Sequence, residues 1–277
     1  MRTVSVEHYE NFPVASVLCP PALRPPVVAI YHFARTADDI ADEGDQPVDT
    51  RLALLAAYRG DLHAVLSGSQ PSATWPAVFL PLARCIRAFT LPGALLHDLL
   101  DAFEQDVRNP LYPDRSSLLA YCRRSANPIG RLMLHLHGRV DAMSLQRSDA
   151  ICSALQLINF WQDLSIDGPR GRHYVPLADQ RSFGVTPAQM REGTDDERSR
   201  AMVRELCAWA RALMLQGAPL ALQLPGRAGW ELRLIVQGGL RVLDKIAAID
   251  HQTLVRRPKL SARDVPPLLW RALRMRV

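Results

Sequence analysis

The sequence predicts an all-α protein. Alanine and leucine dominate the 277 residues and runs of β-branched residues are rare, a composition that favours helices. No segment alternates apolar and polar residues with a period of two, so no β-sheet is expected. Neither an internal repeat nor a shift in composition marks a linker, and we therefore expect residues 1–277 to form a single domain.

Prolines and a glycine bound the first predicted helix. Pro25-Pro26 ends any upstream structure, Pro26 suits a first helical turn, and Gly44 follows the last apolar repeat, so a helix is expected over residues 26–43. Further helices are expected, in chain order, over residues 50–66, 75–88, 93–108, 116–124, 128–141, 148–166, 196–222 and 227–250, with a short one after Pro266-Pro267. The stretch 168–194 is the longest predicted loop, and long loops within a domain are often functional.

Charge and composition are those of an ordinary globular protein. Hydrophobic residues make up 48% and charged residues 22% of the chain, and the net charge of +5 comes almost entirely from arginine. These arginines either form solvated faces or attract an anionic substrate or an anionic membrane surface. No basic stripe with interleaved aromatic residues is present, so nucleic acid is not expected as a partner.

The cysteines and the apolar segments point to the cytoplasm. The five cysteines have neither metal-ligand nor disulfide-framework spacing, which indicates reduced thiols. Residues 1–13 lack the apolar core of a signal peptide. No apolar run approaches the roughly 20 residues that span a bilayer. We expect a cytoplasmic protein that is soluble or lies on the inner face of the membrane.

The first functional motif lies near the end of the first predicted helix. Asp38 and Asp42 are four residues apart and therefore share a helix face, where two like charges are unfavourable without a cation between them. The helix C-terminus also disfavours negative charge. The helix is otherwise apolar enough to be largely buried, so these carboxylates are costly unless they are paired or bind a metal. The alternative is a solvated acidic helix end with Arg35 as partner.

The second motif is a polar stripe on an otherwise apolar helix. Gln156, Asn159, Asp163 and Asp167 recur at spacings of three and four residues. Such a stripe is a sensible wall of a metal site, although a buried hydrogen-bonded network is the alternative. If the two motifs face each other they form an acidic cleft, which Mg²⁺ carrying a diphosphate would complete, because hard cations take carboxylate and phosphate oxygens together.

A loop rich in glycine and arginine follows the second motif directly. Gly168 and Gly171 allow the backbone to approach a ligand closely. Arg170, Arg172 and Tyr174 are suited to contact phosphate oxygens. An ordinary exposed turn is the alternative reading of this loop.

The two motifs together resemble those of the squalene and phytoene synthase family, over nearly the whole chain. The resemblance is carried by Tyr31-x-x-x-Arg35-x-x-Asp38-Asp39-x-x-Asp42 and by Asn159-x-x-x-Asp163-x-x-x-Asp167-x-x-x-Gly171-Arg172-x-Tyr174-x-Pro176. It implies an isoprenoid-synthase fold, in which antiparallel helices surround a central cavity. It also implies an enzyme that acts on prenyl diphosphates with Mg²⁺, or alternatively Mn²⁺, as cofactor, and no nicotinamide is expected.

The resemblance also assigns roles to individual residues. As metal ligands it implies Asp38, Asp39, Asp42, Asn159, Asp163 and Asp167. As catalytic residues it implies Asp38, Asp42, Asp163, Asp167 and Tyr174. As substrate-binding residues it implies His8, Asn11, Phe12, Tyr31, Arg35, Tyr121, Gln156, Arg172 and Arg256.

Within the family the likeness is greatest to the hydroxysqualene synthase branch of bacterial hopanoid biosynthesis. Gln162, Ile166 and the segment 125–130 depart from the pattern of relatives that condense two prenyl diphosphates. The likeness implies presqualene diphosphate as the substrate, which would lose diphosphate, rearrange and capture water. The alternatives are a phytoene, dehydrosqualene or presqualene diphosphate synthase and, from a different class, a non-catalytic helical assembly factor.

The C-terminal segment suggests a membrane contact. Residues 268–277 are basic and apolar and include Trp270, a composition suited to the membrane interface. The alternative is a terminal helix that docks on the domain.

Overall fold

The computed structural model describes residues 19–42 and 46–275, and within these ranges it contains helices and no strand. The helices are α1 (Arg24–Asp42), α2 (Val48–Leu66), α3 (Pro76–Phe89), α4 (Gly93–Arg108), α5 (Arg115–Ser125), α6 (Asn127–Leu136), α7 (Ala142–Gln162), α8 (Leu164–Asp167), α9 (Leu177–Phe183), α10 (Pro187–Glu192), α11 (Glu197–Gly217), α12 (Leu220–Gln223), α13 (Gly226–Ala248) and α14 (Val265–Arg274). Short 3-10 turns precede α1 (η1, Pro21–Leu23) and α14 (η2, Ala262–Asp264). The predicted all-α class is confirmed.

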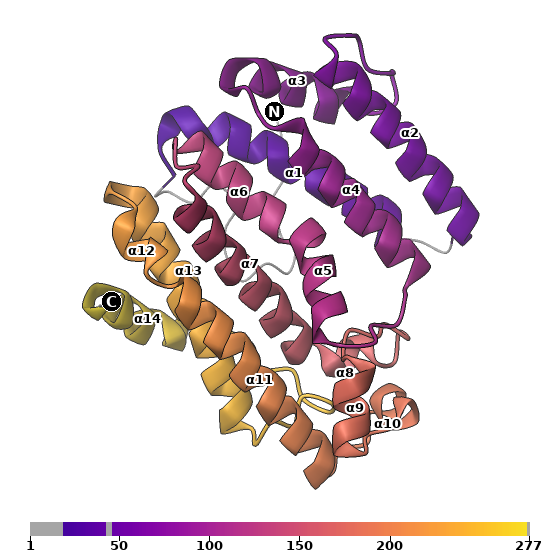
Figure 1. Cartoon of the computed structure of the whole chain (residues 1–277), viewed down its shortest axis with the longest axis vertical. Helices are drawn as coiled ribbons and strands as arrows, with labels where there is room; N and C mark the ends of the chain where they lie inside the picture. Colours follow the sequence, from indigo (N-terminus) through magenta and orange to yellow (C-terminus); the bar gives the residue numbers. More distant parts are fainter. Residues whose placement is uncertain (1–18, 43–45, 276–277) are drawn as a thin grey trace.

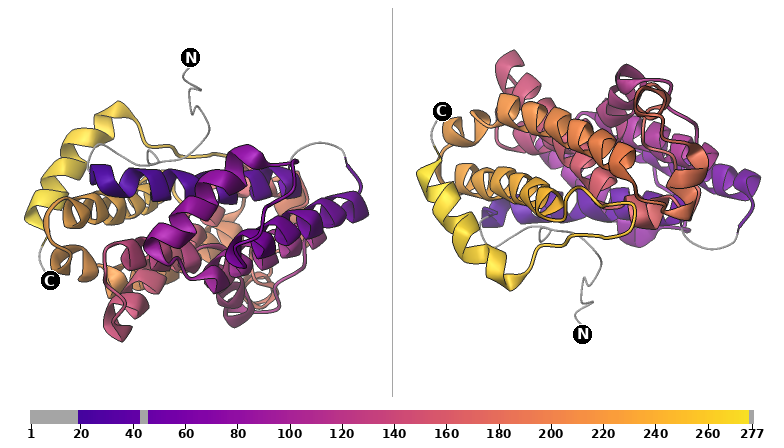
Figure 2. Two further views of the ribbon diagram at one scale, coloured as in Figure 1. Left: turned by 90° about the horizontal axis from the view of Figure 1, so that it is seen from above. Right: turned by 90° about the horizontal axis from the view of Figure 1, so that it is seen from below.

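The helix α7 lies near the middle of the molecule. In Figure 1, α5, α6 and α7 lie between α1–α4 on one side and α11–α14 on the other. Both views of Figure 2 place α14 (yellow) and α2 (purple) at opposite ends of the molecule. The buried apolar side chains form two clusters. One cluster lies among α1, α2, α3 and α4, around Phe33, Tyr58 and Phe79. The other lies among α7, α11 and α13, around Trp161 and Leu206. The elements that later supply the site come from both clusters.

Several predicted helices end earlier than expected. The helix predicted over 128–141 stops at Leu136, because Gly138 adopts a left-handed conformation with φ of 66° and closes the turn. The helix predicted over 148–166 begins at Ala142 and stops at Gln162, and a separate turn, α8, follows. The helix predicted over 196–222 is divided into α11 and α12 just before Pro219.

The prediction of a loop over 168–194 was wrong in part. This stretch contains α9 and α10, each ended by a glycine in the left-handed conformation, Gly184 and Gly193. Thr186 Oγ1 caps α10 by accepting from the backbone N–H of Gln189. In return, Gln189 Oε1 accepts from the backbone N–H of Thr186. The capping sequence was therefore present but was overlooked.

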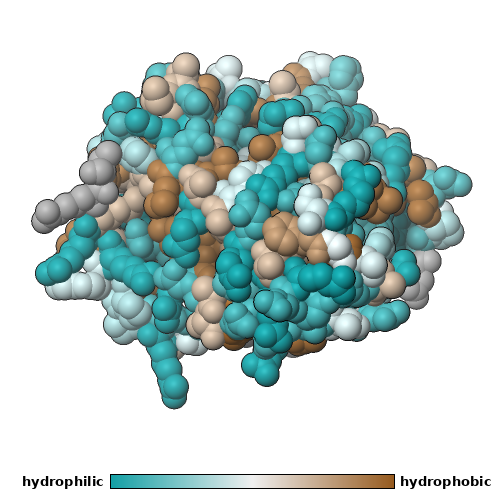
Figure 3. Space-filling view, turned by 60° about the horizontal axis from the view of Figure 1, so that its bottom comes forward, coloured by the Kyte–Doolittle hydropathy of each residue, from teal (hydrophilic) through white to brown (hydrophobic). Residues whose placement is uncertain are grey.

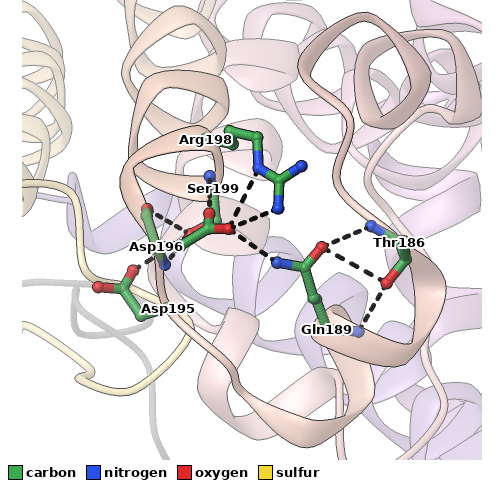
Figure 4. Close-up of polar contacts among 6 residues, drawn as sticks. All are labelled: Thr186, Gln189, Asp195, Asp196, Arg198 and Ser199. Carbon is green, nitrogen blue, oxygen red and sulfur yellow. Dashed lines mark hydrogen bonds and ion pairs between the residues drawn. The ribbon is translucent and has the colours of Figure 1, made fainter.

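A polar network ties α10 to the start of α11 (Figure 4). Gln189 Nε2 donates to Asp196 Oδ2 over 3.1 Å, and Asp196 in turn caps α11 by accepting from the N–H of Ser199. This network matters for the site because α10 lies directly against the turn that follows α8. A Cβ placed on Gly168 would be 2.1 Å from the carbonyl oxygen of Met190, so only glycine allows this close approach.

The remaining surface and the cysteines agree with a globular protein. The face shown in Figure 3 is mainly hydrophilic, with apolar side chains scattered over it. All five cysteines are free thiols, as expected. Over the described ranges, no helix has both the length and the apolar character that crossing a membrane requires.

Candidate active site

Most of the predicted polar residues meet in one cavity of about 250 Å³ between α1, α4, α5, α7 and the loop after α8. Its lining consists of Asp38, Asp42, Phe103, Asp106, Tyr121, Ser125, Gln156, Asn159, Phe160, Asp163, Asp167, Arg172 and Tyr174. Polar side chains provide nearly all of this lining, so the cavity suits a charged group better than a hydrocarbon. We call it the acidic cavity.

Helix α1 supplies the first pair of carboxylates. Asp38 and Asp42 lie one turn apart and both face the acidic cavity. Burial, followed by the neighbouring charge of Asp42, raises the pKa of Asp38 to about 6, and Arg35 opposes this shift. Arg35 pairs with Asp38 over 2.9 Å and with Asp39 over 2.7 Å. Asp39 and Arg35 do not line the cavity themselves.

The second pair lies where α7 ends. Asp163 has φ of −102° and ψ of 10°, which interrupts the helix, and Asp167 then closes α8. Burial raises the pKa of Asp167 to about 6, while the positive charge of Arg172 lowers it. Arg172 also reaches across the cavity to Asp42 on α1, with 2.8 Å between Nη2 and Oδ2. The loop after α8 therefore bridges the two aspartate motifs.

Two residues of this site were missed by the sequence reasoning. Arg257, which follows α13, donates from Nε and Nη2 to the two oxygens of Asp163 over 2.5 and 2.9 Å. Asp106 on α4 lines the acidic cavity and accepts a 2.9 Å hydrogen bond from the hydroxyl of Tyr121. Burial raises the pKa of Asp106 to about 8, against the lowering effect of that hydrogen bond, and the charges of Asp42 and Asp38 add to the rise. The sequence did contain a signal for Asp106, because it is an aspartate on the otherwise apolar face of α4, where a charged side chain is unusual without a function or a partner.

Aromatic rings form one side of the cavity. Tyr174 stacks on Phe160 with 3.8 Å between ring centroids and 8° between planes. Tyr121 lies 6.2 Å from each of these rings, and Tyr112 lies behind it. The stack joins the loop after α8 to α7, and its two rings line the same cavity as the carboxylates.

A second, apolar cavity of about 270 Å³ lies nearer the start of α7. Ser148, Cys152 and Leu155 line the apolar cavity, and Asn159 and Asp163 line the acidic one. The four positions within α7 follow helical spacing and share one face, which is about 17 Å long at 1.5 Å per residue. Most of the remaining apolar lining comes from α6, α12 and α13, with Cys19 and Val27 at the start of the described chain, and includes Met133, Leu134, Leu220, Leu224, Leu232 and Ile235. The pair of cavities is thus polar at one end and apolar at the other.

The other predicted substrate residues lie elsewhere. Tyr31 packs edge-on against His32 and is not part of the cavity lining. Arg256 is exposed, and its neighbour Arg257 makes the contact with the second motif. His8, Asn11 and Phe12 lie outside the described residues.

The donor groups fit a hard divalent cation in their chemistry. Carboxylate and amide oxygens, which Mg²⁺ prefers, line the acidic cavity from Asp38, Asp42, Asn159, Asp163 and Asp167. Among the described residues, however, no three His, Cys, Asp or Glu side chains converge closely enough to hold a metal as they stand. Three of the carboxylates are instead held by arginines.

Comparison with known proteins gives consistent matches over most of the chain. The family model for squalene/phytoene synthase matches residues 6–264. A hydroxysqualene synthase from Rhodopseudomonas palustris is 33% identical over 252 residues, which cover 90% of this chain and 84% of that protein. A hydroxysqualene synthase from Zymomonas mobilis is 38% identical over 184 residues, which cover 65% of this chain and 59% of that protein. The crystal structure of a squalene synthase from Alicyclobacillus acidocaldarius superposes with a TM-score of 0.80 at 34% identity, covering 88% of this chain and 90% of that one.

Proposed function

The chain belongs to the squalene/phytoene synthase family, and from this premise we propose that it is a hydroxysqualene synthase, which converts presqualene diphosphate and water into hydroxysqualene and diphosphate. The observation that supports this most is that α7 lines both cavities, an apolar one with its first half and the acidic one with its last turns. A diphosphate ester of a long hydrocarbon has the same distribution of charge and apolar surface. The hydroxysqualene synthases among the relatives support the choice of product.

The charged residues of the acidic cavity would bind the diphosphate end. Asp38, Asp42, Asn159, Asp163 and Asp167 supply the oxygens to hold Mg²⁺, or Mn²⁺ in its place. When bound, such an ion stabilises the negative charge that develops on the leaving oxygen, an effect worth several kcal/mol. Arg172 and Arg257 add guanidinium groups that can donate to phosphate oxygens in pairs.

The reaction requires one C–O bond to break and another to form. The bond to diphosphate breaks with its electron pair on the leaving oxygen, which leaves a carbocation on the hydrocarbon. Phe160, Tyr174 and Tyr121 line the acidic cavity together with the carboxylates, and an aromatic ring whose face meets the cation would stabilise it by about 0.5 to 2 kcal/mol. After rearrangement, a water oxygen donates an electron pair to the cationic carbon and its proton passes to the diphosphate. The apolar cavity would exclude other water until then.

A product analysis tests the proposal. Purified protein with Mg²⁺ and without nicotinamide is given presqualene diphosphate or, separately, farnesyl diphosphate, and the extracts are examined by mass spectrometry. We expect hydroxysqualene from presqualene diphosphate only, and loss of turnover in Asp163→Asn. Asp149→Asn is the matched control, since its partner is Arg131 outside both cavities, and it should retain turnover.

Other products would identify the alternatives. Presqualene diphosphate, dehydrosqualene or phytoene formed from prenyl donors would assign the chain to the enzymes that condense two prenyl diphosphates. A folded protein that gives no product from any of these substrates would favour the non-catalytic helical assembly factor.

We also propose that the protein is cytoplasmic and contacts the membrane through α14. Leu269, Trp270 and Leu273 are 52%, 54% and 60% exposed, and Arg274 lies over the Trp270 ring. The opposite side of α14 packs on α13, where Ala272 is buried, so the helix is docked and still presents an apolar face. Wild-type protein should sediment with anionic vesicles, whereas a variant with glutamate replacing both leucines should not. Equal binding by both proteins would refute the contact.

A further inference from the structure

Several carboxylates that face the acidic cavity form ion pairs with arginines. Arg172 pairs with Asp42 over 2.8 Å, and Arg257 pairs with Asp163. Both pairs join separate elements: the loop after α8 reaches α1, and the segment after α13 reaches the end of α7. The acidic charge of the cavity is therefore already partly balanced by groups of the protein itself.

The Arg257–Asp163 pair is held firmly in place. Both Asp163 oxygens accept from Arg257, and the two side chains are only 15% and 14% exposed. Next to this pair, Gln162 is 1% exposed and its Nε2 donates to the carbonyl oxygen of Pro258 over 2.6 Å. Asp163 thus binds the side chain of Arg257, and Gln162 binds the backbone of the next residue, Pro258. The side chain and the backbone of this segment are therefore both held against the end of α7.

This geometry places the guanidinium groups in competition with a metal ion. Both oxygens of Asp163 accept from Arg257, and Oδ2 of Asp42 pairs with Arg172. A cation on either carboxylate would therefore lie beside a positively charged guanidinium group, and the repulsion opposes its binding. A guanidinium displaced from a partly buried carboxylate loses the favourable interaction with that carboxylate. Diphosphate provides another anion, because its oxygens match the paired donors of arginine.

We propose that Arg172 and Arg257 couple the binding of the metal to the binding of the diphosphate. Each guanidinium holds a carboxylate in the free protein and transfers to a phosphate oxygen when that carboxylate becomes a metal ligand. Neither ligand then binds tightly without the other, and the coupling is reciprocal. Gln162 is a positioning residue in this scheme because it acts through Arg257. The inference rests on the proposed function for its choice of ligands.

The test measures metal affinity without turnover. Mn²⁺ is titrated into the full chain, once without and once with inorganic diphosphate, and the free Mn²⁺ is measured by electron paramagnetic resonance. The Mn²⁺ that binds to diphosphate in solution is measured separately and subtracted. We expect diphosphate to tighten Mn²⁺ binding by about tenfold or more, within the range usual for coupled sites. In the absence of diphosphate, Arg257→Met and Arg172→Met should each bind Mn²⁺ at least about fivefold more tightly than wild type and should lose most of the gain from diphosphate.

A matched control separates this exchange from a general change in charge. Arg131 pairs with Asp149 outside both cavities, so Arg131→Met removes the same charge and should change Mn²⁺ affinity by less than about twofold. Gln162→Met, which retains Arg257 but removes the bond to Pro258, should give an intermediate affinity. Equal effects of all three arginine variants, or no effect of diphosphate on wild type, would overturn the inference. Neither result depends on the product assay, so a failure of the proposed function is recognised separately.

Discussion

Asp106 offers a direct test of the electrostatics of the acidic cavity. Its carboxyl group is the most strongly perturbed acid there, with a pKa raised from 3.8 to about 8, chiefly by burial. Asp106→Asn replaces it with a neutral group of nearly the same shape, whose carbonyl oxygen can still accept from Tyr121. The substitution therefore removes the ionisation and keeps the packing.

The sign and size of the effect follow from the two pKa values. Below pH 4 the carboxyl is protonated in both the folded and the unfolded protein and contributes nothing to the pH dependence. Between pH 4 and pH 8 only the unfolded protein releases the proton, so the free energy of unfolding falls as pH rises, by at most about 1.4 kcal/mol per pH unit. Summed to pH 7, the loss is on the order of 4 kcal/mol, as an upper bound because water enters the cavity. Asp38 and Asp167, with pKa values of about 6, act with the same sign at lower pH.

Urea unfolding at several pH values, in the presence of a chelator, measures the difference. Wild type should lose stability between pH 6 and pH 8, whereas Asp106→Asn should be nearly constant over that interval and should retain the fall between pH 4 and pH 6. At pH 8 the variant should exceed wild type by several kcal/mol. Parallel curves for the two proteins between pH 6 and pH 8 would show that the Asp106 carboxyl is ionised in the folded protein and would refute the reasoning.

Two further predictions concern the walls of the cavities. In Gly130→Ala, the new Cβ would lie 2.4 Å from Ser148 Oγ and 2.5 Å from Cys152 Sγ, in the wall of the apolar cavity. We expect the free energy of unfolding to fall by about 1 to 3 kcal/mol, measured by thermal unfolding, and KM to rise because the cavity narrows, measured by steady-state kinetics. If both values stayed unchanged, this packing would be contradicted. Ser125 lines the acidic cavity and its hydroxyl has no hydrogen-bond partner, so it is available to bind the reacting water. If it does, Ser125→Ala should release diphosphate at the wild-type rate but incorporate less labelled water into the product. Full incorporation would exclude a role for this hydroxyl in placing the water.

The helical class and the polar face of each motif were predictable because their signals are local. Asp38 and Asp42 on one helix, and Asn159 and Asp163 on another, project from one face at helical spacing whatever the tertiary structure. Both pairs line the acidic cavity. The assignment of these residues as metal ligands stays a prediction.

The remaining parts of the site depend on contacts between distant segments. Arg257 is 94 residues from Asp163, and neither residue type nor spacing distinguishes it from Arg256 beside it. Asp106 becomes a cavity residue only when α4 packs beside α5 and α1. The interruption of the helix at Asp163 is also not signalled locally, since neither glycine nor proline occurs there.

The division of the buried core gives the acidic cavity a second consequence. Asp38 and Asp42 belong to α1, whose buried side chains lie in one apolar cluster, whereas Asn159 belongs to α7, which forms part of the other. A ligand that contacts both sides acts as a reversible cross-link between the two halves of the fold, and its binding adds to the free energy of unfolding in proportion to the logarithm of its concentration. In a cell, the lifetime of the protein against proteolysis would then follow the supply of its substrate.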